Sequence, residues 1–197
     1  ARGARVDRWW RPVFDEQRDT PFAQLRDEFL ACLESAVRRA AGDDAEAAFL
    51  SGGTDSSTVA GLLGRVRGRP ARTFSIGFAV EGYDEMAYAR IAARAFATDH
   101  AEYYVTAGDV LAHLPAVAGT FDQPFGNSSA LPAYLCARYA RERGVGVMLA
   151  GDGGDELFGG NERYARQKLF EPYESVPRAL RRGLLEPLAT NAAVRGV

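Results

Sequence analysis

A short run of glycines, hydroxyl side chains and one carboxylate has the composition of a phosphate-binding turn. It reads Ser51-Gly52-Gly53-Thr54-Asp55-Ser56-Ser57, here called the serine loop, and it lies between a predicted strand and a predicted helix. Adjacent glycines let the backbone turn sharply and approach an anion, and the start of a helix adds free amides. Asp55 would repel phosphate unless a cation bridges them, and Mg²⁺ accompanies nucleotides. The serine loop therefore predicts a site for a magnesium-bound nucleotide.

This run is not the common lysine-containing phosphate loop, because no Gly-Lys-Ser/Thr follows its glycines. A loop with that lysine serves chemistry at the terminal phosphate of a nucleotide. The alternative interpretation, a β–α turn that binds nothing, is disfavoured because all the loop residues fall at the right place between strand and helix.

A second group of carboxylates follows a later predicted strand. Residues 151–160, here called the acidic loop, contain Asp152, Asp155 and Glu156 among glycines. Carboxylates grouped so closely are unfavourable unless they face water, a cation or an ammonium group. Alone, the acidic loop could be a solvated turn that caps the next helix. Since the carboxyl ends of parallel strands meet at one edge of a sheet, the two loops together indicate one site.

The elements that must position these loops alternate along the chain after residue 44. Short apolar runs predict strands at 47–50, 72–78, 101–105 and 145–150. Helical spacing of apolar residues predicts helices at 56–65, 85–96, 110–120 and 131–143. This alternation predicts an α/β fold, a parallel twisted sheet with helices on both faces.

One further helix is predicted before the alternation begins. Thr20 would cap it and Pro21 would occupy its first position. Its buried face would consist of residues at helical spacing: Phe22, Leu25, Phe29, Leu33, Ala36 and Val37. Residues 1–19 are Arg-rich and irregular, which is typical of a linker.

Composition excludes several classes of partner. The chain has 197 residues and a net charge of −2 with both signs interspersed, so no nucleic acid is expected to bind. No apolar run reaches the ~18 residues of a membrane helix, so no membrane partner is expected. Cys32 and Cys136 lie in helical patterns without metal-ligand spacing and are expected to be buried thiols. We expect a cytoplasmic protein with reduced thiols.

The two loops together resemble those of the asparagine synthetase (glutamine-hydrolysing) family. The serine loop is similar to the pyrophosphate loop SGGxDSS of the N-type ATP pyrophosphatase (PP-loop) superfamily, and the acidic loop to a family signature. Other segments match in the same order: Phe74-Ser75-Ile76-Gly77-Phe78, Tyr83-Asp84-Glu85, Thr98-Asp99-His100, Asp122-Gln123-Pro124-Phe125 and Ser128-Ser129-Ala130-Leu131-Pro132. The resemblance covers roughly residues 9–170. It implies an adenine nucleotide alpha hydrolase-like synthetase domain at 20–197, C-terminally truncated, and a linker at 1–19 from a missing N-terminal glutaminase domain.

The resemblance implies an ATP-dependent amide-forming synthetase. A substrate carboxylate would attack the α-phosphorus of ATP, pyrophosphate would leave, and ammonia from glutamine would displace AMP. The expected partners are thus a small-molecule carboxylate, ATP and glutamine-derived ammonia, with homodimer formation left open. Family members carry a catalytic lysine downstream of the acidic loop, in a segment that this chain does not reach. We therefore expect residues 1–197 alone to be inactive.

The resemblance also implies roles for single residues. The nucleotide would contact residues from three strand ends: Phe49, Leu50, Ser51, Gly52, Gly53, Asp55, Ser56, Ser57, Ile76, Ala150 and Gly151. Asp55 and Asp155 would bind Mg²⁺. Asp152 would orient an amino-acid substrate or accept a proton from ammonia, and Asp155 and Glu156 would complete the catalytic acidic group.

Two alternatives remain open. The first is a related amide-forming enzyme that acts on a larger carboxylate, such as a β-lactam synthetase-like or an exopolysaccharide- or exosortase-associated amidotransferase. The segment Asn161-Glu162-Arg163-Tyr164, which departs from the usual family sequence, fits this alternative better. Asn127 stands where relatives commonly have aspartate, so the substrate need not be aspartate. The second is a non-catalytic nucleotide-binding module, which the intact carboxylates of both loops disfavour.

Overall fold

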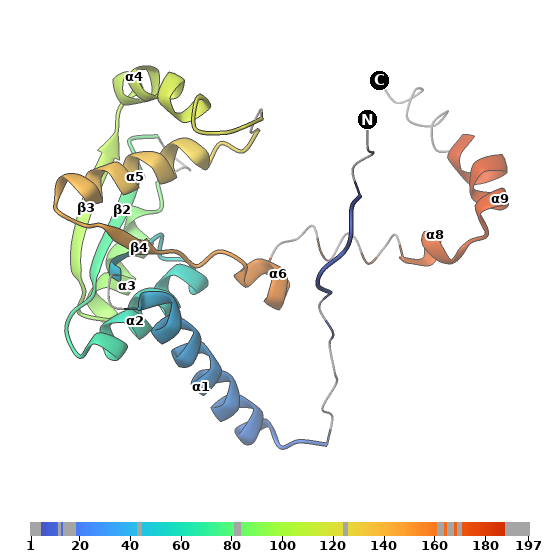
Figure 1. The fold of residues 1–197 in the computed structure, drawn as a ribbon, viewed down its shortest axis with the longest axis horizontal. Coiled ribbons are helices and arrows are strands. Elements are labelled where there is room, and N and C mark those ends of the chain that lie inside the picture. Colours follow the sequence, from blue (N-terminus) through green and yellow to red (C-terminus); the bar gives the residue numbers. More distant parts are fainter. Residues whose placement is uncertain are drawn as a thin grey trace.

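A four-stranded parallel sheet forms the centre of the computed structural model, in the order β3-β2-β1-β4 (Figure 1). The structure describes residues 5–11, 13, 19–42, 45–80, 84–123, 126–160, 164, 168 and 171–187. The strands are β1 (Ala45–Phe49), β2 (Arg72–Phe78), β3 (Asp99–Val105) and β4 (Val147–Leu149). All three neighbouring pairs run parallel. The predicted parallel sheet is therefore confirmed, with β4 shorter than expected.

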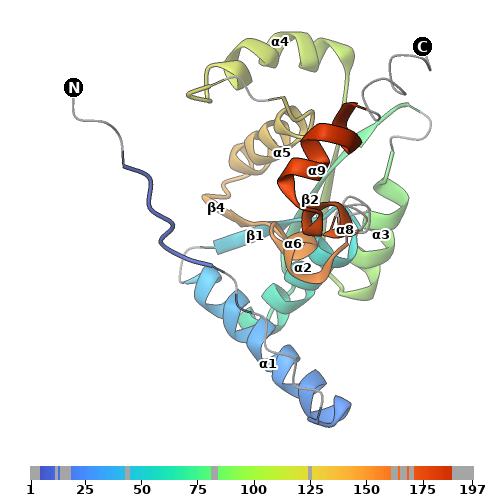
Figure 2. The same cartoon turned by 90° about the vertical axis from the view of Figure 1, so that its right-hand side faces the viewer.

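Helices cover both faces of this sheet (Figures 1 and 2). The larger helices are α1 (Phe22–Ala41), α2 (Thr54–Arg67), α3 (Met86–Ala95), α4 (Ala107–Ala118) and α5 (Ala130–Glu142). The shorter ones are α6 (Gly154–Phe158), α8 (Glu171–Ser175), α9 (Arg178–Leu180) and a π-helical turn at Arg181–Leu185. The helix predicted at 110–120 starts three residues earlier because Thr106 and Asp109 form a capping box.

Two apolar cores lie on opposite sides of the sheet. Ala47 and Ala48 are both fully buried, and they face opposite sides because side chains alternate along a strand. Ala48 joins a core made with α1, α2 and α3. Ala47 joins a second core that includes Phe74 of β2 and Cys136 of α5. Small alanines on β1 let helices pack closely on both faces of the central strand.

The order of the strands reverses between β1 and β4. The chain passes from β1 to β2 and then β3 in one direction, and it returns to the other side of β1 for β4. Ala48 pairs with Thr73 of β2 on one side and with Leu149 of β4 on the other. In open parallel sheets, ligands bind at the carboxyl ends of the strands where the order reverses. The serine loop and the acidic loop follow the two strands that flank this point.

The prediction for α1 is partly wrong. The helix begins at Phe22, and Pro21 precedes it without a side-chain cap, so Thr20 is not the N-cap. Phe22 is 80% exposed and Phe29 43% exposed, whereas Val37 is buried. The first half of α1 projects beyond the sheet and α2, and only its second half is covered (Figure 1).

The two cysteines differ in exposure. Cys32 lies near the middle of α1, and it is exposed, which contradicts the prediction of a buried thiol. Cys136 on α5 is buried as predicted. The family-like positions Tyr83, Pro124 and Phe125, and the departure from the family sequence at 161–163, lie outside the described residues. Among the helices of the described part, none is long and apolar enough to cross a membrane.

Candidate functional site

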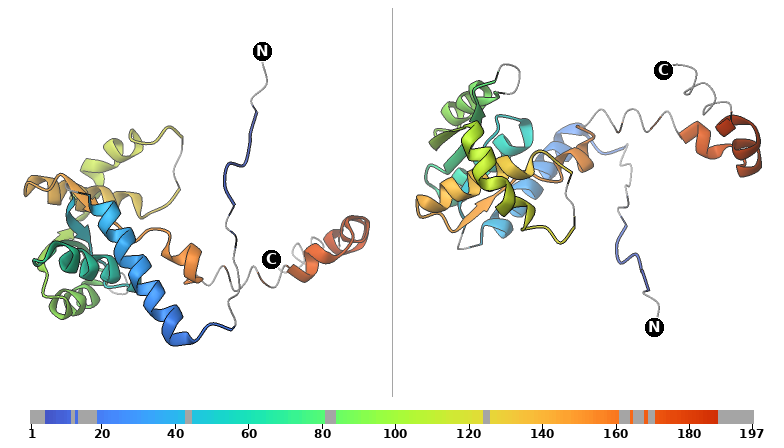
Figure 3. Two further views of the ribbon diagram at one scale, coloured as in Figure 1. Left: turned by 60° about the horizontal axis from the view of Figure 1, so that its bottom comes forward. Right: turned by 90° about the horizontal axis from the view of Figure 1, so that it is seen from above.

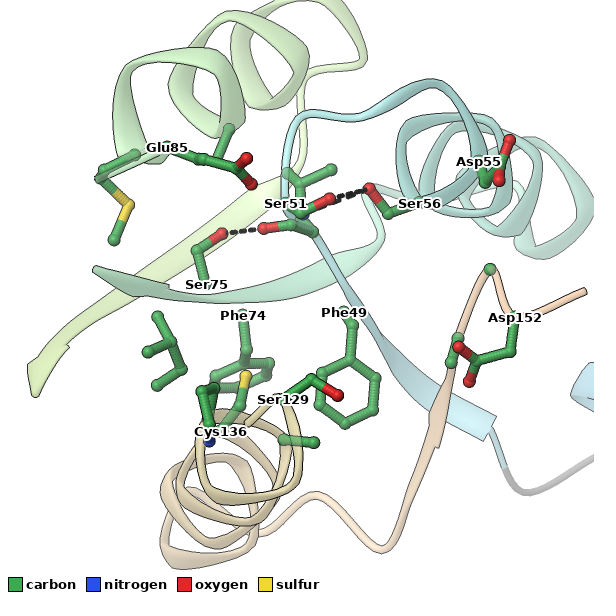
Figure 4. A pocket seen from close by; sticks show the side chains of 18 of the residues that line it. Phe49, Ser51, Asp55, Ser56, Phe74, Ser75, Glu85, Ser129, Cys136 and Asp152 are labelled. Carbon is green, nitrogen blue, oxygen red and sulfur yellow. Dashed lines mark hydrogen bonds between the residues drawn. The ribbon is translucent and has the colours of Figure 1, made fainter. Parts of the chain in front are cut away.

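The two loops meet beside one cavity at the carboxyl edge of the sheet. The cavity has a volume of about 520 Å³, within the range of small-molecule sites. Ser51 and Ser56 of the serine loop line one part of it, and Asp152 of the acidic loop lines another (Figure 4). The strand order thus brings together segments that lie about a hundred residues apart in the sequence.

The serine loop is held in its turn by its own hydroxyl groups. The Oγ atoms of Ser51 and Ser56 lie 2.8 Å apart in a hydrogen bond, and the Ser51 amide donates to Ser56 Oγ at 3.2 Å. The Gly53 amide donates to Ser51 Oγ at 3.3 Å, and Ser56 Oγ donates to the Gly53 carbonyl at 3.3 Å. The loop therefore has its folded shape without a ligand, which lowers the ordering cost of binding one.

Gly52 is required in this turn for two reasons. Its φ of 85° lies in the left-handed region that side chains disfavour. A Cβ atom added there would also collide with the backbone of Tyr88 and Ala89, at the start of α3. The glycine therefore lets the serine loop pack directly on α3.

The entrance to the serine loop is tied to β2. The Leu50 amide donates to the Phe74 carbonyl at 3.0 Å, and Ser75 Oγ donates to the Leu50 carbonyl. Both bonds extend the pairing of β1 and β2 past the end of β1. The turn thus starts from a fixed position at the edge of the sheet.

The lower part of the cavity is mostly apolar, with the Ser129 hydroxyl as a polar group among the rings (Figure 4). Phe49, Phe74, Ile76 and Cys136 all line it, and the labelled side chains Phe49, Phe74 and Cys136 lie below β2 in Figure 4. Burial raises the pKa of the Cys136 thiol to about 12, so it is a neutral, apolar group at physiological pH. This floor suits a flat, uncharged ring, while the serine loop beside it suits an anion.

The acidic loop packs directly against the serine loop through its glycines. A Cβ atom added to Gly151 would lie 2.9 Å from the Asp55 carbonyl carbon and 2.9 Å from the Ser56 nitrogen. A Cβ atom added to Gly154 would collide with the Asp55 carboxylate. Only residues without a side chain allow this approach. The carboxylate of the serine loop therefore lies against the backbone of the acidic loop.

The charge of the cavity is wholly negative among the described residues that line it. Asp55, Glu85 and Asp152 contribute carboxylates, and no lysine, arginine or histidine contributes a cation. The described part of the chain contains no group of three or more His, Cys, Asp or Glu residues that could hold a metal alone. Mg²⁺ commonly takes only one or two carboxylates and completes its shell with phosphate oxygens and water. The residues present therefore fit an ion that arrives with a nucleotide.

Many of the predicted site residues line this cavity. They are Phe49, Leu50, Ser51, Asp55, Ser56, Ile76, Ala150, Gly151 and Asp152. The remaining predicted residues, Gly52, Gly53, Ser57, Asp155 and Glu156, do not line it. Ser57 Oγ is buried and has no hydrogen-bond partner among the described residues. Glu156 accepts a hydrogen bond of 3.1 Å from the Tyr164 hydroxyl, and Asp155 lies against Gly160.

Sequence reasoning missed part of the lining. Glu85, Ser129 and Cys136 line the cavity but were not predicted as site residues. The family-like segments around Glu85 and Ser129 were a usable signal for the first two. For Cys136 no local signal existed, because its place in the cavity follows from how α5 packs on the sheet.

A polar network joins β3 to α3, the helix on which the serine loop rests. Arg90 of α3 donates to both carboxylate oxygens of Glu102, at 2.8 and 2.6 Å. This pairing lowers the pKa of the Glu102 carboxyl. His100 Nδ1 hydrogen-bonds to Thr73 Oγ1 at 2.9 Å, and burial lowers the pKa of His100 below 6.5.

Comparisons with known proteins agree with this geometry. The chain is 37% identical over 160 residues to the "putative asparagine synthetase (glutamine-hydrolyzing)" of Mycobacterium tuberculosis, covering 80% of this chain and 24% of that protein. A protein of the same description, numbered 2, from Methanocaldococcus jannaschii is 37% identical over 175 residues, covering 87% of this chain and 32% of that one. Asparagine synthetase (glutamine-hydrolyzing) 1 of Bacillus subtilis (strain 168) is 31% identical over 180 residues, covering 91% and 28%.

The chain spans less than a third of the length of each of these relatives. The model of the asparagine synthase family matches residues 28–194, which include both loops and the whole sheet. The chain belongs to the asparagine synthase family.

Proposed function

We propose that this chain is the ATP-using part of an amide-forming synthetase. The observation that carries the proposal is the direct contact of the serine loop with the acidic loop beside one cavity, at the point where the strand order reverses. The cavity pairs an apolar floor with a loop shaped for an anion, which is the combination that an adenine nucleotide requires. In the proposed reaction, a substrate carboxylate attacks the α-phosphorus of ATP and pyrophosphate leaves.

The serine loop would hold the leaving pyrophosphate. Ser51, Gly52, Gly53, Ser56 and Ser57 carry the amides and hydroxyls of this turn, and several of these groups bond to one another in the free protein. On binding, those donors would exchange their internal hydrogen bonds for bonds to the phosphate oxygens, where they would stabilise developing negative charge.

Asp55 and Asp155 are the groups that we propose to hold Mg²⁺. Asp55 lines the cavity, and its carboxylate lies against Gly154, the residue before Asp155. When bound, the ion supplies charge neutralisation for the phosphates in a cavity whose described lining contains no cationic side chain. The carboxylates would fix its position relative to the serine loop.

Asp152 would act on the acyl side of the reaction. It lines the cavity on the acidic-loop side, next to Gly151, whose backbone lies against Asp55 and Ser56. From there its carboxylate would meet an ammonium group of the substrate or accept a proton from the attacking ammonia. Because the relatives are named as glutamine-hydrolyzing, we propose glutamine as the source of that ammonia. A cytoplasmic location is likewise a proposal.

Exchange of labelled pyrophosphate into ATP tests the proposal in the full-length protein. A panel of carboxylic acids is supplied one at a time with MgATP. We expect exchange that depends on one class of carboxylate and that disappears in Asp55→Asn. Release of ADP and phosphate in place of AMP and pyrophosphate would refute attack at the α-phosphorus. The acid that supports exchange also distinguishes aspartate from a larger substrate.

A further inference from the structure

We propose that Phe29 of α1 is a positioning residue for the acidic loop, and that it acts by holding α6 through Phe158. This inference rests on the proposed function, because it concerns how Asp155 is placed. It also explains two features that the proposed chemistry leaves unused. One is the apolar stripe of α1, which stays partly exposed at Phe29. The other is the Leu157-Phe158 half of the acidic loop, which contains no group that could react.

Few contacts fix α6 to the rest of the protein. This helix has five residues, and none of them is buried. Gly153 precedes it with φ 92° and Gly159 follows it with φ 70°, so a left-handed glycine lies at each end. Such residues let the chain change direction readily. A short helix between two such joints needs a side-chain contact to set its orientation.

Besides the hydrogen bond between Tyr164 and Glu156, the structure provides an aromatic pair between α1 and α6. The ring centroids of Phe29 and Phe158 lie 5.5 Å apart, and the ring planes meet at 89°. This edge-to-face geometry is a preferred arrangement for two aromatic rings. Phe29 is 43% exposed and Phe158 59% exposed, so each ring covers part of the other. The two segments come together beyond the edge of the sheet (Figure 3).

The orientation of α6 determines where the carboxylates of the site lie. The helix begins at Gly154, whose backbone lies against the Asp55 carboxylate, and the next residue is Asp155. A rotation of α6 would move Gly154 away from Asp55 or into it, and it would swing Asp155 at the same time. Phe29 does not line the cavity, so its effect on the site passes through Phe158.

The test uses the full-length protein with Phe29→Ala, Phe158→Ala and both together. Phe29→Tyr keeps the ring and serves as the conservative variant. Phe22→Ala is the matched control, since Phe22 lies on the same helix and is 80% exposed. The first measurement is amide hydrogen exchange of residues 154–158, which needs no substrate. The second is the Mg²⁺ concentration that gives half-maximal pyrophosphate exchange.

We expect each alanine variant to raise the rate of amide hydrogen exchange in residues 154–158 by about fivefold, with the rates in α2 and α5 unchanged. The Mg²⁺ concentration that gives half-maximal pyrophosphate exchange should also rise by about fivefold. The double variant should be no worse than either single one, because both remove the same contact. Phe29→Tyr should leave both values as they are in the unmodified protein, and Phe22→Ala should change each by less than about twofold.

Unchanged hydrogen exchange in Phe29→Ala would overturn the inference, whether or not the protein shows pyrophosphate exchange. Raised hydrogen exchange with an unchanged Mg²⁺ requirement would also overturn it, since α6 would then be held without positioning the site. Absence of pyrophosphate exchange in the unmodified protein would contradict the proposed function, and the hydrogen-exchange result would still decide whether Phe29 holds α6.

Discussion

The serine loop and the acidic loop lie in contact, but the protein holds them in different ways. The serine loop leads into α2, a helix of 14 residues that contributes buried Ala60 and Leu63 to a core. Its turn is closed by hydrogen bonds among Ser51, Gly53 and Ser56. The acidic loop contains α6, a helix of five residues with none buried. The serine loop is therefore continuous with a helix that packs in the core, whereas the helix of the acidic loop packs on the surface.

This difference suggests a division of labour. A loop that has its shape before binding suits a group that is the same in every turnover, such as the phosphates of a nucleotide. A loop held by glycine contacts, one aromatic pair and the hydrogen bond between Tyr164 and Glu156 can adjust more easily, which suits the side of the site that receives different reactants. Each substitution below tests one side of this contrast.

The largest effect is expected where the two loops touch. In Gly154→Ala, the added methyl group would collide with the Asp55 carboxylate and displace it from its place beside the acidic loop. We expect pyrophosphate exchange to fall by on the order of 10²-fold or more, because small misplacements of reacting groups have effects of that size. Gly146→Ala is the control, since nothing lies within 4 Å of the added atom. Equal activities of the two variants would show that the contact is not needed.

Next in size is the effect of Asp152→Asn, which removes a charge and keeps the side-chain size. Amide formation should fall by about 10²-fold, while MgATP affinity should stay within about threefold. Asp55→Asn should weaken MgATP binding and adenylation together. Calorimetry of MgATP binding and mass spectrometry of the amide product measure the two effects. If Asp152→Asn lost nucleotide binding as severely as Asp55→Asn, Asp152 would belong to the metal site.

A smaller effect is expected for two neighbouring serines of the serine loop. Ser57→Ala removes a buried hydroxyl without a described partner, so the free protein should gain about 1 kcal/mol of stability. Ser56→Ala removes hydrogen bonds to Ser51 and should lose about as much. Denaturant unfolding measures both changes.

The same pair also tests the proposed phosphate contacts. If both hydroxyls hold pyrophosphate, each variant should bind it about fivefold more weakly, the size of one lost hydrogen bond. Titration of pyrophosphate with Mg²⁺ by calorimetry measures this affinity. Unchanged affinity in Ser57→Ala would remove Ser57 from the proposed site, because its hydroxyl would then stay buried when the ligand binds.

The last effect appears only at acidic pH and concerns His100 of β3, the strand that Arg90 joins to α3. Burial lowers the pKa of His100 below 6.5, so the unfolded chain takes up a proton at a higher pH than the folded one. Stability is then fully present above pH 6.5 and declines as the pH falls below it, by at most about 1.4 kcal/mol per pH unit. His100→Asn should flatten this decline in unfolding curves between about pH 5 and 7. An equal slope in both proteins would contradict the assignment to His100.

Much of the fold followed from local pattern. The alternation of short apolar runs with helical spacing predicted the parallel sheet, because period and length distinguish strands from helices before any tertiary contact forms. The bounds of α2, α3 and α5 differ from those predicted by only one or two residues. The serine loop and the acidic loop were recognisable because a turn against an anion restricts which residues can occupy it.

Tertiary structure alone decided which faces are covered. Phe22 and Val37 follow the same helical spacing on α1, yet one is 80% exposed and the other 7%. The spacing defines an apolar face of α1. The extent of the contact between α1 and α2 determines how much of that face is buried. Likewise, Cys136 lines the cavity and Cys32 is exposed because of how α5 and α1 pack, which helical spacing does not determine. The contact of Gly154 with Asp55 is of this kind too, since strand order, which no local pattern contains, places the ends of β1 and β4 side by side.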